Sequence, residues 1–99
     1  MGRPISPLKR KADTPEEALG AVITELRIKR NMSYQEVAAI VGCNEGHMNE
    51  IEHGKQNPTL KTLRAIADVH KIKLSKMFAL AERKHARSQA AKGATPKSS

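Results

Sequence analysis

Residues 34–53 read YQEVAAIVGCNEGHMNEIEH, an apolar pattern that few structures other than two short, steeply crossing helices require. The apolar side chains are those of Val37, Val41, Cys43, Met48 and Ile51. Their helical spacing changes register after Gly42, as it must when a second helix leaves in a new direction. Ala38 is small enough for a close crossing, and Gly42 suits the turn because a positive φ costs little without a Cβ. The pattern therefore predicts a helix-turn-helix unit.

A unit of this kind is typical of DNA-binding proteins, in which the second helix enters the major groove. The charge of the chain fits such a partner but lies at its two ends. Of the formal net charge of +8, residues 1–11 and 81–99 supply +4 each, and residues 12–80 balance nine basic against nine acidic side chains. Basic ends on a neutral domain are consistent with phosphate contacts outside the reading helix, and equally with solubilising tails.

The composition limits the class of protein further. Ninety-nine residues make one domain, and an apolar content of 38% supports only a compact core. A single cysteine offers no disulfide framework and fits a reducing compartment. No apolar run approaches the length of a membrane span or follows the basic start as a signal peptide would. We therefore expect a cytoplasmic protein that does not enter a membrane.

Capping signals predict where five helices begin and end. Ser, Thr or Asn before an apolar stripe is typical of a helix start, and Gly just beyond the stripe is typical of its end. The predicted helices cover residues 14–30, 33–42, 44–54, 59–69 and 74–87, with N-caps at Thr14, Ser33, Asn44 and Thr59. In the fourth, Leu60, Leu63, Ile66 and Ala67 should face the core.

The fold class that follows is all-α, with a five-helix domain between two tails. The domain should span residues 14–87. Residues 1–13 contain Pro4, Pro7 and four cations and are predicted to form a flexible basic arm. Residues 88–99, rich in Ser, Ala, Gly and Pro, are predicted to form a disordered tail.

From Leu19 to Phe78 the chain resembles the lambda-repressor/Cro family, also called the XRE family of bacterial and phage regulators. The matching stretches are LGAVITELRIKRNMSYQEVA, VGCNEGHMNEIEHGKQNPTLKTLRAIA and IKLSKMF. Within them IEHGKQNPTLKTL is especially specific, because it joins a Glu before a glycine turn to a helix whose start is marked by Pro. The resemblance implies a lambda-repressor-like DNA-binding domain of five helices. It also implies a structural ion pair between Arg27 and Glu52, in which a guanidinium can bridge two helices bidentately.

The same resemblance implies which residues would contact the bases of double-stranded DNA. They lie in the first turns of the third predicted helix and are Asn44, Glu45, Gly46, His47, Asn49 and Glu50. Cys43, Met48 and Ile51 share the opposite face and should be core. Asn49 can pair with adenine, and a Glu can accept from cytosine N4. The family usually has amides, serines or basic residues here, so Glu45 and Glu50 must be matched to cytosine or held away from phosphates.

Two groups of residues are predicted to bind phosphates. The first lies at the start of the second predicted helix, where free backbone N–H groups and the helix dipole favour an anion. The second follows the third helix. Together the predicted phosphate contacts are Ser33, Tyr34, Lys55, Gln56, Asn57 and Lys61.

A single reading helix covers few base pairs, so the resemblance implies a homodimer on a two-fold operator, with half-sites about 34 Å apart. The predicted dimer contact is on and just before the last helix, at Ile72, Leu74, Met77, Phe78 and Leu80. Phe78, the only Phe in the chain, could equally cover the monomer's own core.

Nothing in the sequence favours an enzyme, a cofactor or a metal site. Cys43 and His47 have a helical spacing that can hold a metal, but no further ligand has credible spacing. No nucleophile–base pair and no Gly-rich phosphate loop is recognisable. His70 stands where the family prefers Leu, and we expect a half-buried core histidine.

The function favoured by these observations is a small dimeric transcriptional regulator, of the phage-repressor or restriction–modification controller type. Two alternatives stay open. The chain could be the antitoxin of a toxin–antitoxin pair, or a protein-interaction module whose acidic third helix has lost base reading and binds a protein partner.

Overall fold

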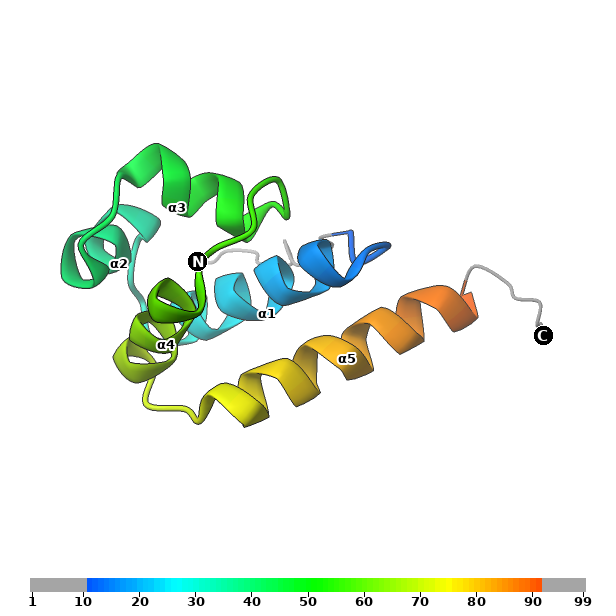
Figure 1. Cartoon of the computed structure of the whole chain (residues 1–99). Helices are drawn as coiled ribbons and strands as arrows, with labels where there is room; N and C mark the ends of the chain where they lie inside the picture. Colours follow the sequence, from blue (N-terminus) through cyan, green and yellow to red (C-terminus); the bar gives the residue numbers. More distant parts are fainter. Residues whose placement is uncertain (1–10, 92–99) are drawn as a thin grey trace, which may run out of the picture.

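The computed structural model describes residues 11–91, which form five α-helices and no strand (Figure 1). The helices are α1 (Pro15–Lys29), α2 (Tyr34–Val41), α3 (Glu45–Glu52), α4 (Leu60–Val69) and α5 (Leu74–Ala91). The predicted all-α class and the number of helices are therefore confirmed. Most of the predicted arm and tail, residues 1–10 and 92–99, lies outside the described residues.

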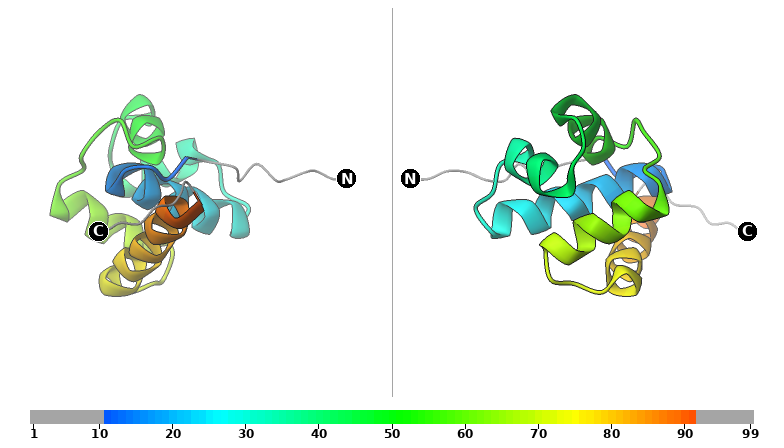
Figure 2. Two further views of the ribbon diagram at one scale, coloured as in Figure 1. Left: turned by 90° about the vertical axis from the view of Figure 1, so that its right-hand side faces the viewer. Right: turned by 60° about the vertical axis from the view of Figure 1, so that its left-hand side comes forward.

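Helix α1 is the centre of the arrangement. It packs along α5 on one side and contacts α3 on the other (Figure 1). Helices α2 and α3 form the steeply crossing pair that the spacing around Gly42 predicts, and α4 contacts both α2 and α5 (Figure 2). The helix-turn-helix is thus held on the face of α1 that is turned away from α5.

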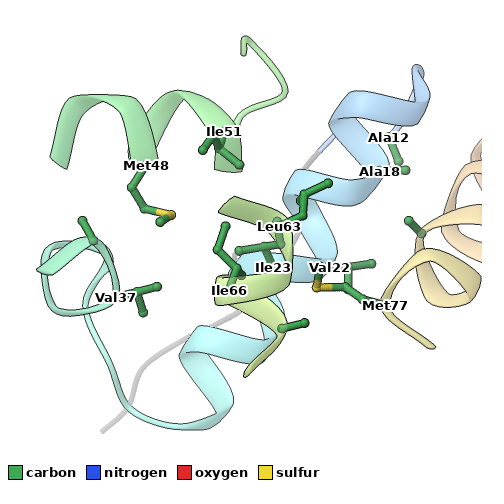
Figure 3. Packing of buried hydrophobic residues seen from close by; sticks show 13 residues of the cluster. Ala12, Ala18, Val22, Ile23, Val37, Met48, Ile51, Leu63, Ile66 and Met77 are labelled. Atoms are coloured by element: carbon green, nitrogen blue, oxygen red, sulfur yellow. The ribbon is translucent and has the colours of Figure 1, made fainter. Parts of the chain in front are cut away.

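Side chains from all five helices meet in one core (Figure 3). The largest fully buried apolar side chains are Ile23, Val37, Met48, Ile51, Ile66 and Met77. In Figure 3, Met48 of α3 and Val37 of α2 point into the same interior space, beside Ile66 of α4. Burying each such side chain stabilises the fold by about 1.5–3 kcal/mol. Because this core contains the inner faces of α2 and α3, it fixes which face of α3 remains outside.

The helix starts follow the predicted caps. The Thr14 hydroxyl accepts from the Glu17 N–H at 3.0 Å, and Ser33 with Glu36 forms a complete capping box. Asn44 caps α3, and Thr59 accepts from the backbone N–H of Thr62 at 3.1 Å. These bonds satisfy N–H groups that the first turn of a helix leaves without intrahelical partners.

Residues with positive φ lie just after several helices, and two of these residues are not glycine. Gly42 has φ 88°, as the predicted turn requires. Asn31 after α1 and Lys71 after α4 also have positive φ, at 56° and 54°. In each case the next residue donates back to a carbonyl of the last turn, as in the bond from Ile72 N to Ala67 O at 3.0 Å. This is the Schellman arrangement that ends a helix sharply.

Gly20 sets the distance between α1 and α3. A Cβ built at this position would lie 2.3 Å from the carbonyl oxygen of Glu52 and 2.6 Å from that of Ile51. The backbones of the two helices can therefore approach this closely only because residue 20 has no side chain.

Two expectations about the ends of the domain are wrong, and so is one about its core. Helix α5 ends at Ala91 rather than near Arg87, because its last turns bond to the segment before α1. The Ser88 hydroxyl donates to Asp13 Oδ1 at 3.1 Å, and Gln89 Nε2 donates to the Asp13 carbonyl at 3.2 Å. The folded domain also begins before Thr14, because Asp13 makes these bonds and Ala12 is only 6% exposed. Leu60, expected in the core, is 65% exposed at the first position of α4.

Candidate nucleic-acid interface

Helix α3 has one buried face and one open face. Met48, Ile51 and Glu52 are buried. Cys43, just before the helix, is half-buried rather than fully in the core, and burial raises the pKa of its thiol. The predicted base-reading residues lie on the other face: Asn44, Glu45, Gly46 and Glu50 are exposed, and His47 and Asn49 are half-buried. The structure therefore brings the predicted set together on one surface.

Asn44 at the start of this surface also has a structural role. Its Oδ1 accepts from the backbone N–H of Gly46 at 2.7 Å and from that of His47 at 3.3 Å. The side-chain acceptor is thus used within the helix, and only the Nδ2 amide remains for an outside partner. Gly46 lets the Asn44 side chain lie close to the helix backbone, because a Cβ at residue 46 would lie 3.1 Å from Asn44 Oδ1.

Glu50 on this surface has a hydrogen-bond partner within residues 11–91. Gln56 Nε2 donates to Glu50 Oε1 at 2.9 Å. The backbone carbonyl of Glu50 also accepts from the N–H of Lys55 at 2.8 Å. Its side chain and its main chain are therefore both tied to the loop that follows α3.

The start of α2 offers backbone donors beside this surface. The first intrahelical bond of α2 joins Val37 N to Ser33 O at 3.1 Å, so the N–H groups of Tyr34 and Gln35 precede it. The N–H of Glu36 and that of Ser33 are already used in the capping box. The Tyr34 ring is half-buried against the core, with the guanidinium carbon of Arg27 6.0 Å from its centroid. At this distance the guanidinium and the ring form a weak cation–π contact.

The loop after α3 and the first turn of α4 carry the second group of predicted phosphate contacts. Lys55, Gln56, Asn57 and Lys61 are all exposed. Their position depends on Gly54, which has φ 74° and sits so close to α1 that a Cβ would lie 2.7 Å from Glu17 Cα. Packing against the start of α1 therefore fixes the direction in which this loop leaves α3.

A buried ion pair lies underneath the surface and joins α1 to α3. Arg27 Nε donates to Glu52 Oε2 at 2.7 Å, and Arg27 Nη2 donates to Glu52 Oε1 at 2.9 Å. The Glu52 side chain is 1% exposed and that of Arg27 is 14% exposed. Arg27 Nη1 also donates to the Met32 carbonyl at 3.0 Å. The structure thus contains the predicted pair, and its bidentate geometry fixes the angle between the two helices.

His70 is more deeply buried than expected, with 6% of its surface exposed. Neither ring nitrogen has a hydrogen-bond partner among the residues that the structure describes. Burial lowers the pKa of this imidazole, and the nearby positive charge of Arg30 lowers it further. The neutral ring is therefore the form that the fold stabilises.

The predicted dimer contact is only partly available. Met77 is fully buried in the monomer core, so its inclusion in that contact is wrong. Ile72, Leu74 and Leu80 are partly buried against the core, and Phe78 is 38% exposed. Phe78 lies at the side of an open groove of about 530 Å³ between the start of α1, the loop before α4, and α5. The groove is mostly apolar, and Glu16 and Glu82 are among the polar residues that line it.

Two residues that position the surface were not singled out from the sequence. Gly20 sets the depth of α3, and a glycine inside a helical apolar pattern is the signal that could have indicated a close backbone approach. His53 ends α3, and its Nδ1 donates to the Asn49 carbonyl at 2.8 Å, a bond that no sequence pattern marks. Within residues 11–91, no group of three or more His, Cys, Asp or Glu could hold a metal ion, and no helix could cross a membrane.

Comparison with known proteins gives one family and one fold. A family model described as helix-turn-helix (HTH_3) matches residues 23–77. A crystal structure of the clp gene regulator ClgR from Corynebacterium glutamicum has a TM-score of 0.75 and 22% identity, covering 80% of this chain and 83% of that one. A second ClgR structure from the same organism has a TM-score of 0.69 and 19% identity, covering 73% of this chain and 92% of that one. No curated protein matches the sequence. At these identities the ClgR structures show a shared fold.

Proposed function

Because this chain belongs to the XRE family of helix-turn-helix proteins, and is a DNA-binding transcriptional regulator rather than an enzyme, we propose that α3 reads base edges in the major groove. The observation that carries this proposal is the division of α3 into two faces. Met48 and Ile51 anchor the helix in the core, while the exposed side carries donors and acceptors that can meet base edges.

Each side chain of this face has a distinct role in the proposal. Asn49 pairs with adenine, and Glu50 and Glu45 accept from exocyclic amines such as cytosine N4. His47 donates to a guanine or to a phosphate. Asn44 acts mainly as the cap of α3 and contributes its Nδ2 amide, because its Oδ1 is bonded to the helix backbone. Gly46 lets the backbone of α3 approach the base pairs closely.

The phosphate contacts lie on both sides of the reading helix. On one side the N–H groups of Tyr34 and Gln35 and the hydroxyl of Ser33 meet a phosphate at the start of α2. On the other side Lys55, Gln56, Asn57 and Lys61 follow α3, and all four are exposed. Contacts on both flanks set the register of α3 on the duplex.

The protein acts as a homodimer on a two-fold operator in this proposal, because one α3 reads only a few base pairs. The contact uses Phe78 together with the exposed parts of Ile72, Leu74 and Leu80. Support comes from the 38% exposure of Phe78, an apolar side chain beside an apolar groove. Light scattering on concentrated protein should give twice the chain mass, and Phe78→Ala should lower it toward the monomer. A monomeric wild-type mass at high concentration would contradict the dimer.

A selection of binding sites from random DNA duplexes, with the full chain at physiological salt, tests base reading. A sequence with two-fold symmetry should be enriched, and Asn49→Ala with Glu50→Ala should abolish the enrichment. Thermal unfolding of the same variants checks that the fold is intact. Weak binding without enrichment would overturn the proposal and favour a protein-interaction role for the acidic surface of α3.

The dependence of affinity on salt tests the phosphate contacts separately. Lys55→Ala should reduce the slope of log affinity against log salt by about one unit, since one phosphate contact is lost. Lys76→Ala is the matched control, because Lys76 is also exposed but lies on α5, across α1 from the reading surface. Equal slopes for the two variants would mean that Lys55 contacts no phosphate.

Within the XRE family, we propose the role of a phage-type repressor or of a controller of a restriction–modification system. An antitoxin is the alternative, in which the same domain regulates its own genes and a second surface binds a toxin. Co-purification of a small protein at a fixed stoichiometry would favour the antitoxin.

A further inference from the structure

The hydrogen bond between Gln56 and Glu50 lies on the proposed reading surface, although the two residues are six positions apart and in different elements. Gln56 Nε2 donates to Glu50 Oε1 at 2.9 Å. Glu50 belongs to α3, and Gln56 belongs to the loop that follows it. Both side chains are exposed, so the bond holds no core together. A contact of this kind acts on the orientation of a side chain more than on the stability of the fold.

The backbone around this bond explains why Gln56 lies beside Glu50. Gly54 is in the left-handed region, and its N–H donates to the Ile51 carbonyl at 3.1 Å. The next N–H, that of Lys55, donates to the Glu50 carbonyl at 2.8 Å, so the chain turns back over the last turn of α3. The close approach of Gly54 to Glu17 of α1 holds this turn in place. The position of Gln56 is thus set by the fold before any partner binds.

The chemistry of the two side chains gives the bond a consequence. An ionised carboxylate only accepts hydrogen bonds, and here one of its oxygens is already bonded to Gln56. The other oxygen, Oε2, is left to accept from outside. In the major groove this matches the N4 amine of cytosine and rejects guanine O6 and N7 and thymine O4, which are also acceptors. Adenine offers an amine at N6 as well, but its adjacent N7 is an acceptor that repels the carboxylate.

The amide of Gln56 has a second N–H on the same nitrogen, and that N–H is free to donate to a phosphate. One side chain could then join the sugar–phosphate backbone to the base-reading carboxylate. It would also reduce the repulsion between Glu50 and the phosphates, because a hydrogen-bond donor lies between the two negative groups. The Gln56 amide would thus allow the acidic Glu50 to face DNA on this surface.

We propose that Gln56 is a positioning residue for base specificity: it holds the Glu50 carboxylate so that Oε2 selects an amine donor, cytosine N4, at one position of each half-site. The inference rests on the proposed reading of the major groove by α3. Gln56 itself contacts no base.

The test compares binding-site selections for the wild type, Glu50→Ala, Gln56→Ala and Gln56→Met. Met keeps the length of the Gln side chain and removes both of its N–H donors. The wild type should prefer cytosine at one half-site position by roughly fivefold or more, the range of one good base contact. Glu50→Ala should abolish that preference. Both Gln56 variants should reduce it to within about twofold while the preference at the Asn49 position persists.

Asn57→Ala is the matched control, because Asn57 is the adjacent exposed amide of the same loop. It should lower affinity for all sequences alike and leave the cytosine preference unchanged. The double variant Glu50→Ala/Gln56→Ala should lose no more preference than Glu50→Ala alone. Thermal unfolding should give the same midpoint for the Gln56 variants as for the wild type, since the bond is exposed. Should Gln56→Ala fold poorly, Gln56→Met provides the same readout.

The outcomes separate this inference from the function on which it rests. If the wild type enriches no sequence, the proposed base reading by α3 fails, and the role of Gln56 fails with it. If the wild type enriches a site whose cytosine depends on Glu50 but not on Gln56, the base reading stands and the positioning role of Gln56 is overturned. Equal loss at every base position in the Gln56 variants would also overturn it, because that result describes a phosphate contact alone.

Discussion

Replacing Glu52 with alanine should destabilise this protein more than any comparable change on its surface. The side chain is 1% exposed, and its two oxygens accept from Arg27 Nε at 2.7 Å and Arg27 Nη2 at 2.9 Å. The Thr24 hydroxyl lies 3.0 Å from Glu52 Oε1 as well. Alanine would remove every acceptor of this group and leave the guanidinium of Arg27 largely buried without its counter-ion.

The expected loss of unfolding free energy follows from these contacts. Removing one partner of a buried ion pair typically costs about 3–5 kcal/mol. The lower end applies here, because the Arg27 side chain is 14% exposed and can be partly hydrated. Arg27 also keeps its bond to the Met32 carbonyl at 3.0 Å. A loss of about 3 kcal/mol in a domain of this size corresponds to a fall in melting temperature of roughly 12–24 °C.

Thermal and urea unfolding followed by circular dichroism measure the effect. Glu25→Ala is the matched control, because Glu25 of α1 also forms an ion pair, with Lys84 of α5, but its side chain is 38% exposed. That pair should contribute less than about 1 kcal/mol. The double variant Arg27→Met/Glu52→Met should recover much of the lost stability, because neither charge is then buried alone.

The opposite result is a Glu52→Ala variant that melts within a few degrees of the wild type, or no lower than Glu25→Ala. Such a result would mean that the carboxylate is hydrated in solution and that α1 and α3 do not meet through a buried pair. A double variant as unstable as the single one would indicate that shape, rather than charge, holds the two helices together.

Three further predictions concern single positions elsewhere in the fold. Gly20→Ala should lower the unfolding free energy in urea by about 1–3 kcal/mol, although Ala has the better helix propensity, because its Cβ would lie 2.3 Å from the carbonyl oxygen of Glu52. An unchanged midpoint would contradict the close approach of α1 and α3. Lys71→Gly should raise the unfolding free energy by about 0.5–1 kcal/mol, because Lys71 has φ 54° and Gly adopts that conformation without strain. A lower melting temperature would show that contacts of the Lys71 side chain matter more than the backbone conformation. Burial lowers the pKa of His70 below its ordinary 6.5. The contribution of the neutral His70 to stability should therefore be complete above pH 6.5 and be lost as the pH falls from there through the folded-state pKa. His70→Leu should flatten this decline when unfolding free energy is measured between about pH 7 and pH 5, and an unchanged slope would assign the decline to other groups.

The parts of the fold that depend on neighbours within about four residues could be predicted from the sequence. Thr14, Ser33, Asn44 and Thr59 cap the helices that they were expected to cap, because a cap bonds to a backbone N–H two or three positions away. Gly42 forms the turn between α2 and α3 for the same local reason. The apolar spacing also identified the buried face of α3, and with it the face that remains open.

Local patterns failed where an element depends on something far away in the chain. Helix α5 runs to Ala91 because its last turns bond to Asp13, and nothing near residue 88 signals this partner. Leu60 shares the helical spacing of Leu63 but is exposed, since spacing gives a direction around the helix axis and not whether another element covers that end. Met77 fills the monomer core, although its place on an amphipathic last helix suited a dimer equally well.

The same division applies to the candidate site. The residues on the outer face of α3 follow from a repeat of three to four positions, so the sequence is sufficient to place them on one surface. Their depth and their partners are not encoded locally. Gly20 sets how closely α3 approaches α1, and Gly54 against Glu17 sets where the following loop turns. Because that turn brings Gln56 to Glu50 across six positions, the orientation of the carboxylate depends on the packing of α1 against the end of α3.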